Sequence, residues 1–312
     1  KVAIIMGIGY PDSSRSHFRS MDIWHTATPE AFRPEGWLGK AVAALDPGRR
    51  DPVTAVNFGR GLPRALAFPD VSAASVGQLT KYGLFTGLPG ATRRDALLDV
   101  VGRVYSPEAF DDWASHRLLS TGTAAQQGAD LLRTAASAYT SSVVYPGQGF
   151  NKISEHLQGV ATVMTGGLGT RIYYTNHGSF DTHGDEVANH ARLWERLSGG
   201  LEAFLLDLDE HGLRENTVLF VFSEFGRRIR ENNAGTDHGA GGIALLIGDR
   251  VRGGLYGEYP SLAPLHQDEG DVRPTTDFRA VYASILEQFL DVDPADVLDR
   301  PGAFAQLPVR RS

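Results

Sequence analysis

The run Thr217–Phe222 (T-V-L-F-V-F) constrains the fold more than any other part of the chain, because almost all its side chains are aliphatic or aromatic. A strand with one solvated face alternates apolar and polar residues, and this run does not. It therefore predicts a central parallel strand that is buried on both faces. The surrounding segments follow the order strand, helix, strand, loop, strand and helix, which predicts an open α/β sheet with crossover helices.

Other segments have the periodicity of individual strands and helices. Further strands are expected at the apolar runs 2–8, 53–58, 171–175 and 243–247. Helices are expected at 153–165, at 185–211 and from Thr276, as the N-cap, to Leu290. The tryptophans are expected to lie in the core rather than to bind a ligand: Trp24, Trp37, Trp113 and Trp194.

Residues 72–142 differ in composition from the rest of the chain. Ala, Leu, Ser and Arg dominate there, with interruptions by Gly and Pro. We expect helices at 93–104, 107–118 and 122–141, which would form a helical insertion or cap. The whole chain, 1–312, is then one domain that contains this insertion.

The overall composition excludes several classes of protein. The net charge of −7 argues against a broad nucleic-acid-binding face. No apolar stretch approaches the roughly 18–20 residues of a membrane-spanning helix, so no integral membrane segment is expected. The absence of cysteine removes disulfides, thiolate ligands and cysteine nucleophiles. Since the sequence starts at Lys1 inside an apparent strand, we expect a processed or truncated chain.

Polar clusters follow or precede the predicted strands, where ligands bind in open α/β sheets. In an extended segment, Asp181 and His183 would point to the same side. Asp237 and His238 repeat the pair, and Glu224 adds another carboxylate. These residues predict a site for a divalent ion, Zn²⁺, Mn²⁺, Mg²⁺ or Ca²⁺, with oxygen and nitrogen ligands. The alternative is that they only form turns and caps. The weaker candidates His177 and His190 flank this segment.

A second cluster, at residues 12–20, combines small hydroxyl side chains with basic ones. Ser14 or Ser16 could act as a nucleophile, and His17 is a further catalytic candidate. Helix N–H groups and the side chain of Arg15 or Arg19 would then hold the anionic product. For any single serine, the alternative is that its hydroxyl caps a helix. A third anion-binding candidate, Arg227, has solvation at the surface as its alternative role.

Five segments together resemble a large bacterial family of proteins of unknown function. They are G-Y-P-D-S-S-R-S-H-F-R-S-M-D-I-W (9–24), S-F-D-T-H (179–183), V-F-S-E-F-G-R-R (221–228), T-D-H-G (236–239) and G-G-L-Y-G-E-Y-P-S-L (253–262). The resemblance implies export by the twin-arginine pathway and a periplasmic or secreted location. It also implies the alkaline phosphatase and sulfatase superfamily, hence a three-layer α/β/α sandwich with a mostly parallel sheet and a metal site at its edge.

The resemblance also assigns positions within the superfamily's metal site. Glu224 takes the place of a metal-binding Asp, and Phe225 stands where the paired His is expected. His238 is similar to the superfamily's last metal His. Asp181 and His183 match its Asp-containing pair, although the usual spacing is Asp-x-x-x-His.

Two departures concern the nucleophile and the first metal ligand. Ser14-Arg15 is similar to the nucleophile loop of sulfatases, but no Cys is present to become formylglycine, so Ser16 or Ser14 would attack. The superfamily's first strand carries a metal-binding Asp and would precede Lys1.

Two hypotheses about function follow. The protein is a metal-dependent hydrolase of small or polymer-borne phosphate or sulfate esters, or it is a non-catalytic exported binding or assembly protein. A calcium site that only staples loops is compatible with either.

Overall fold

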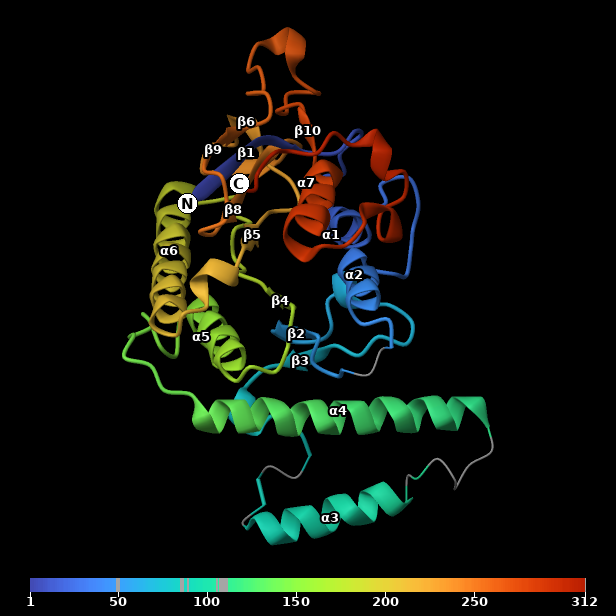
Figure 1. Ribbon diagram of the computed structural model, residues 1–312. Coiled ribbons are helices and arrows are strands. Elements are labelled where there is room, and N and C mark those ends of the chain that lie inside the picture. Colours follow the sequence, from blue (N-terminus) through green and yellow to red (C-terminus); the bar gives the residue numbers. More distant parts are fainter. Residues whose placement is uncertain (49–50, 85–86, 89, 105, 107–111, 312) are drawn as a thin grey trace.

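The computed structural model describes residues 1–48, 51–84, 87–88, 90–104, 106 and 112–311. Their fold is mixed α/β, with helices on both sides of the strands in Figure 1. The strands are β1 (Val2–Gly9), β2 (Ala55–Phe58), β3 (Ala74–Val76), β4 (Ile172–Thr175), β5 (Leu219–Val221), β6 (Arg227–Glu231), β7 (Thr236–His238), β8 (Gly242–Ile247), β9 (Gly254–Tyr256) and β10 (Thr276–Asp277). The helices are α1 (His17–Thr26), α2 (Trp37–Leu45), α3 (Ala91–Val104), α4 (Trp113–Ala138), α5 (Lys152–Thr165), α6 (Glu186–Glu210) and α7 (Phe278–Ile285).

The strands form three sheets rather than one. The largest has the order β10-β1-β8-β5, and β9 also pairs with β1. The second sheet, β3-β2-β4, is entirely parallel. The third is the antiparallel pair β6-β7. In the largest sheet, β1 runs parallel to β9 and β10 but antiparallel to β8, so the expected mostly parallel sheet is replaced by a mixed arrangement.

The run that we expected to form the central strand lies at the end of its sheet. The part of the run that forms a strand, β5, pairs only with β8 among the described strands, and this pairing is antiparallel. All three residues of β5 are half-buried. The central place belongs to β1, where Ala3 and Ile5 are fully buried. An apolar run indicates that a strand is covered by other elements. It does not indicate which strands pair with it.

Two hydrophobic cores hold the helices against the sheets. One joins β1 and β8 to α1, α2 and α7, and stacked rings fill it: Trp24 on Phe222 and Phe278, and Trp37 on Tyr282. The other joins β2 to α4, α5 and α6. The core prediction is therefore confirmed for Trp24 and Trp37. It is wrong for Trp113 and Trp194, which are 76% and 37% exposed.

Residues 72–142 contain the predicted helices in altered form. Helix α3 is confirmed at 91–104, and Figure 1 shows α3 and α4 extending below the rest of the chain. The break expected near residue 120 is wrong, because α4 continues through Gly122, whose missing Cβ would meet nothing. The part of the predicted helix 107–118 before residue 112 lies outside the described residues. No described helix is both long and apolar enough to cross a membrane.

The last predicted helix begins later than expected. Thr276 is not its N-cap, because it belongs to β10, pairs with Ile8 and donates its hydroxyl to the Met6 carbonyl. Asp277 caps α7 instead, by accepting a hydrogen bond from the Arg279 amide. The α-helix then ends at Ile285, and 286–290 form a π-helical turn.

A buried carboxylate fixes the C-terminal end of α6. Asp207 is fully buried and accepts hydrogen bonds from the hydroxyls of Tyr139 and Tyr145, at 2.6 and 2.7 Å. Burial and the bond to Asp207 raise the pKa of the Tyr145 hydroxyl well above its ordinary value. The Nδ1 atom of His211 lies 3.2 Å from the other oxygen of Asp207. This cluster ties the segment after α4 to α6.

Removing one hydroxyl from this cluster should destabilise the fold. Tyr145→Phe deletes a buried hydrogen bond to a charged group, so the free energy of unfolding should fall by about 1.5–3 kcal/mol. Tyr259→Phe is the matched control, because Tyr259 is 70% exposed, and it should change stability by less than about 0.5 kcal/mol. Urea unfolding measures both. Equal values for the two variants would contradict the role of the Asp207 cluster.

The same cluster predicts a pH dependence of stability. Hydrogen bonds to the carbonyls of Asp207 and Thr140, and the nearby carboxylates, raise the pKa of His211 although burial lowers it. Protonated His211 therefore stabilises the fold below its unfolded pKa of about 6.5, and this contribution disappears as pH rises through the folded pKa. His211→Gln should cost more stability at pH 6 than at pH 9. A cost that is the same at both pH values would refute this.

Candidate metal centre

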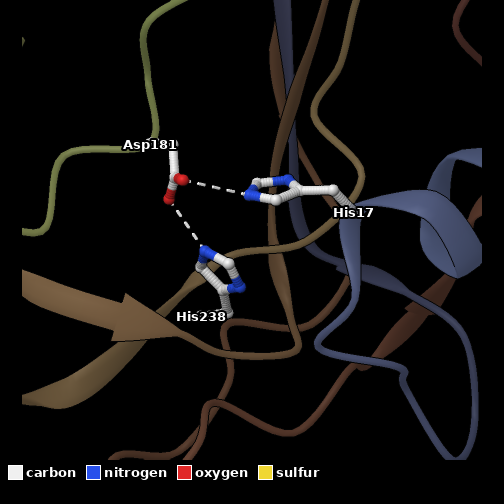
Figure 2. Close-up of side chains that lie close together, drawn as sticks. All are labelled: His17, Asp181 and His238. Atoms are coloured by element: carbon white, nitrogen blue, oxygen red, sulfur yellow. Dashed lines mark hydrogen bonds and ion pairs between the residues drawn. The ribbon is translucent and has the colours of Figure 1, made fainter.

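Three segments that are far apart in sequence meet at one point. His17 is the first residue of α1, Asp181 lies in the loop between β4 and α6, and His238 ends β7. Figure 2 shows the Asp181 carboxylate beside the two imidazole rings, with one interaction to each. One ligand atom from each of the three residues lies within 4.8 Å of the other two, so these residues can hold a metal ion.

Each histidine faces Asp181 through its Nε2 atom. The Nε2 atom of His17 lies 3.2 Å from Asp181 Oδ2, and that of His238 lies 2.8 Å from Asp181 Oδ1. All three side chains are at least partly open to solvent, with 39% of His17, 45% of Asp181 and 19% of His238 exposed. The group is therefore accessible from solvent.

The partners of the opposite ring nitrogens determine the tautomers of the two histidines. His17 Nδ1 lies 2.7 Å from Glu224 Oε1, and His238 Nδ1 lies 2.8 Å from the Arg15 carbonyl oxygen. A carboxylate and a carbonyl only accept hydrogen bonds, so both Nδ1 atoms must donate. In the neutral rings, each Nε2 then presents a lone pair to Asp181. Histidines that bind a metal usually donate such a hydrogen bond from the ring nitrogen opposite the ligating one.

His183 adds a third imidazole whose Nδ1 atom also faces an acceptor and whose Nε2 atom also faces Asp181. Its Nδ1 lies 3.2 Å from Asp237 Oδ1, and its Nε2 lies 2.8 Å from Asp181 Oδ1 and 3.0 Å from His238 Nε2. The predicted common side for Asp181 and His183 is therefore confirmed. Nitrogen lone pairs and carboxylate oxygens converge here, and acceptors this close repel one another unless a proton or a cation lies between them.

Without a bound ion, a proton on an imidazole can occupy the space between its Nε2 atom and the Asp181 carboxylate. Burial raises the pKa of Asp181, but bonds from His238, His17 and Arg227 outweigh it, and the pKa lies far below its ordinary value. Asp181 is therefore a carboxylate at neutral pH. The hydrogen bond to Glu224 raises the pKa of His17, partly opposed by burial. Protons and a metal ion compete for these nitrogens, and the donor set fits a divalent ion.

Close backbone contacts bring the β6-β7 hairpin to the Asp181 loop. A Cβ atom on Gly235 would lie 2.6 Å from the Thr182 carbonyl oxygen, so only glycine permits this approach. Arg227 Nε donates to the Thr236 hydroxyl at 3.0 Å, and its NH2 group donates to the Thr182 carbonyl at 3.1 Å. The guanidinium also lies 3.3 Å from Asp181 Oδ1. Arg227 thus holds the hairpin and the loop together.

An aromatic cluster supports the other side of the Asp181 loop. The Phe180 ring makes edge-on contacts with His177, His190 and Trp194, at centroid distances of 5.3, 5.6 and 5.8 Å. His177 Nε2 also lies 3.3 Å from the Leu193 carbonyl, and the Trp194 indole donates to His190 at 3.2 Å. His177 and His190 therefore anchor the loop. They do not belong to the metal group, which consists of His17, Asp181 and His238.

Two predicted metal ligands, Glu224 and Asp237, contact ring nitrogens of histidines at the site instead. Glu224 is the hydrogen-bond partner of His17, and Asp237 is the partner of His183. Bonds from Asn232 and His183 lower the pKa of Asp237. Phe225, where a paired histidine was expected, is buried and packs against the rings of His17 and His238, at 5.0 and 4.7 Å. His17, expected as a catalytic group, lies in the metal group.

The basic residues predicted to hold an anion already have partners. Arg15 bonds the buried carboxylate of Asp271 at 2.8 Å and pairs with Glu269. Arg19 pairs with Asp22 at 2.9 Å and donates to the Pro29 carbonyl. The structure thus places neither guanidinium in an anion site.

The predicted nucleophiles lie in the loop that leads into His17. Ser14 Oγ accepts a hydrogen bond from the Ser16 amide at 3.2 Å. Ser16 is the N-cap residue of α1, yet its side chain makes no capping hydrogen bond. It lies between Arg15 and His17 in the sequence. The Ser16 hydroxyl is therefore not committed to the helix end.

The sequence analysis missed a cavity beside the site. It has a volume of about 510 Å³ and includes Asp181 and His183 in its wall. Arg192 and Arg196 line it from the N-terminal half of α6. Their four-residue spacing directly after the Asp181 loop places both on one helix face, and that spacing was the available signal.

Metal binding is the direct test of this geometry. The wild-type protein should bind about one Zn²⁺ per chain, because two or three imidazoles and one carboxylate form a zinc-type ligand set. Asp181→Asn should remove this binding, and Glu224→Gln should weaken it by about 10- to 100-fold. His116→Gln, which alters an exposed imidazole on α4, is the control and should bind normally. Calorimetry with elemental analysis measures all four proteins, and unchanged metal content in Asp181→Asn would refute the site.

Comparison with known proteins gives one result for the whole chain. No curated protein and no solved structure matches it. A family model described as "Protein of unknown function (DUF1501)" matches residues 8–303. That match spans every segment of the site, from His17 to His238. The chain therefore belongs to the DUF1501 family of proteins of unknown function.

Proposed function

We propose that this protein is a metal-dependent hydrolase of phosphate or sulfate esters. The observation that supports it most is the convergence of Nε2 atoms from His17, His183 and His238 on the Asp181 carboxylate, with every Nδ1 bonded to an acceptor. The proposal includes an alkaline phosphatase-like sandwich and an exported protein. The motif resemblance supports both of these.

The ligand chemistry favours a borderline ion over a hard one. Calcium and magnesium take mainly oxygen ligands, whereas imidazole suits zinc and other first-row transition ions. His17, Asp181 and His238 would hold the ion, with His183 as the nearest additional ligand. A bound divalent ion would supply Lewis-acid stabilisation of the charge that develops on the ester oxygens. A calcium site that only staples loops fits these imidazoles poorly.

Ser16 is the proposed nucleophile. Its hydroxyl is free of the capping role, and it precedes the first turn of α1, whose amides attract anions. The Ser16 oxygen would form a bond to the phosphorus or sulfur atom while the ester oxygen leaves with its electron pair and takes up a proton. Water would then cleave the serine ester, releasing phosphate or sulfate and restoring the hydroxyl.

One observation favours the second candidate, a non-catalytic binding protein on the same fold. Phe225 fills the position of an expected ligand and packs against both His17 and His238. A site reduced in this way can retain a metal ion without turning over an ester. The two functions differ in turnover, not in metal content.

The activity test uses 4-nitrophenyl phosphate and 4-nitrophenyl sulfate. Metal-free wild-type protein should be inactive and should recover turnover of one ester when Zn²⁺ or Mn²⁺ is added. Asp181→Asn should stay inactive, Ser16→Ala should fall to near the background rate, and His116→Gln should match the wild type. Stoichiometric metal without turnover of either ester would favour the binding protein. Full activity of Ser16→Ala would exclude Ser16 as the nucleophile.

A further inference from the structure

The cavity beside the metal centre has the size of a small-molecule site. Its volume of about 510 Å³ lies within the range of about 300–1,000 Å³ typical of such sites. Asp181 and His183 form part of its wall, so it is continuous with the candidate metal centre. A phosphate or sulfate group alone would leave most of it empty. The cavity therefore has room for the rest of a small ester.

The lining of this cavity is rich in hydrogen-bond donors. Arg192 and Arg196 contribute two guanidinium groups, and Asn189 and Ser179 contribute an amide and a hydroxyl. Among the described residues that line it, Leu193 is the one large aliphatic residue, and Asp181 is the only carboxylate. Asp181 is also the proposed metal ligand. This surface suits a polar, negatively charged occupant and is a poor match for a lipid chain or an aromatic ring.

The two arginines differ from the others near the site in their partners. Arg15 is bound to Asp271, and Arg227 contacts Asp181 and two threonines. Arg192 instead donates to the neutral side-chain oxygen of Asn189. Arg196 adds positive charge here. Burial lowers the pKa of His177, and the charge of Arg196 lowers it further. Among the described residues, neither guanidinium has a carboxylate partner, and such groups in a concave wall are suited to bind carboxylate or phosphate oxygens.

We infer that Arg192 and Arg196 bind a second anionic group of the substrate, so that preferred substrates are small, polar esters with at least two anionic groups. This inference rests on the proposed function in placing the ester group at the metal centre. The Arg192 and Arg196 end of the cavity would take a carboxylate or a further phosphate or sulfate of the same molecule. Selectivity would then depend on α6, not on the metal ligands.

Two matched compounds test this inference by binding, without requiring turnover. 2-Phosphoglycolate and ethyl phosphate share a two-carbon phosphate ester and differ in the carboxylate. Calorimetry on the Zn²⁺-loaded wild type should show at least about tenfold tighter binding of 2-phosphoglycolate, the gain expected from one charge-assisted contact. The double variant Arg192→Gln/Arg196→Gln should lose that preference and bind both compounds alike.

A control variant separates this effect from a change in net charge. Arg252→Gln/Arg311→Gln removes two exposed arginines outside the cavity and should keep the preference. Zn²⁺ stoichiometry and circular dichroism check that each variant is folded. The inference is overturned if the wild type binds both compounds equally or binds neither, or if the preference survives in Arg192→Gln/Arg196→Gln. Selective binding without hydrolysis of any ester would keep it and would refute the proposed hydrolase instead.

Discussion

The carboxylate of Asp181 is the contact on which the site depends. It lies within 3.3 Å of nitrogen atoms from His17, His183, Arg227 and His238, which come from three separate parts of the chain. Each of these parts has its own support, such as the Phe180 ring cluster behind the loop. The geometry is therefore held from outside the ligands, which favours a binding site over a chance cluster of exposed polar groups.

Helix α6 connects that site to the rest of the structure. Its C-terminal end is fixed by the buried Asp207, and its N-terminal half carries the arginines that line the cavity. The helix packs along α5 within the second hydrophobic core. A rigid helix positions side chains more precisely than a loop does. The metal ligands thus lie on loops and strand ends, whereas the proposed selectivity residues lie on one long, anchored helix.

Local patterns in the sequence were sufficient for most elements and for the identity of several site residues. The apolar runs that form β1, β2, β4 and β8 and the periodicity of α5 and α6 were recognisable without tertiary information. The two-residue spacing of Asp181 and His183 correctly placed both side chains together. The roles within the cluster were harder to predict. Glu224 was expected to bind the metal and His17 to take part in catalysis, but His17 faces Asp181 and Glu224 orients its imidazole.

The sequence by itself therefore determined most of the long helices and apolar strands, and several of the polar residues that gather at their ends. Hydrophobic periodicity and side-chain chemistry are local properties, so they can be read from neighbouring residues. Only the tertiary structure decided that β1 is the central strand and that β5 lies antiparallel at the end of its sheet. It also decided that Arg15 is bound to Asp271 while Arg192 and Arg196 face a cavity. Strand pairing and the partner of a long charged side chain depend on contacts between distant residues, which no local pattern records.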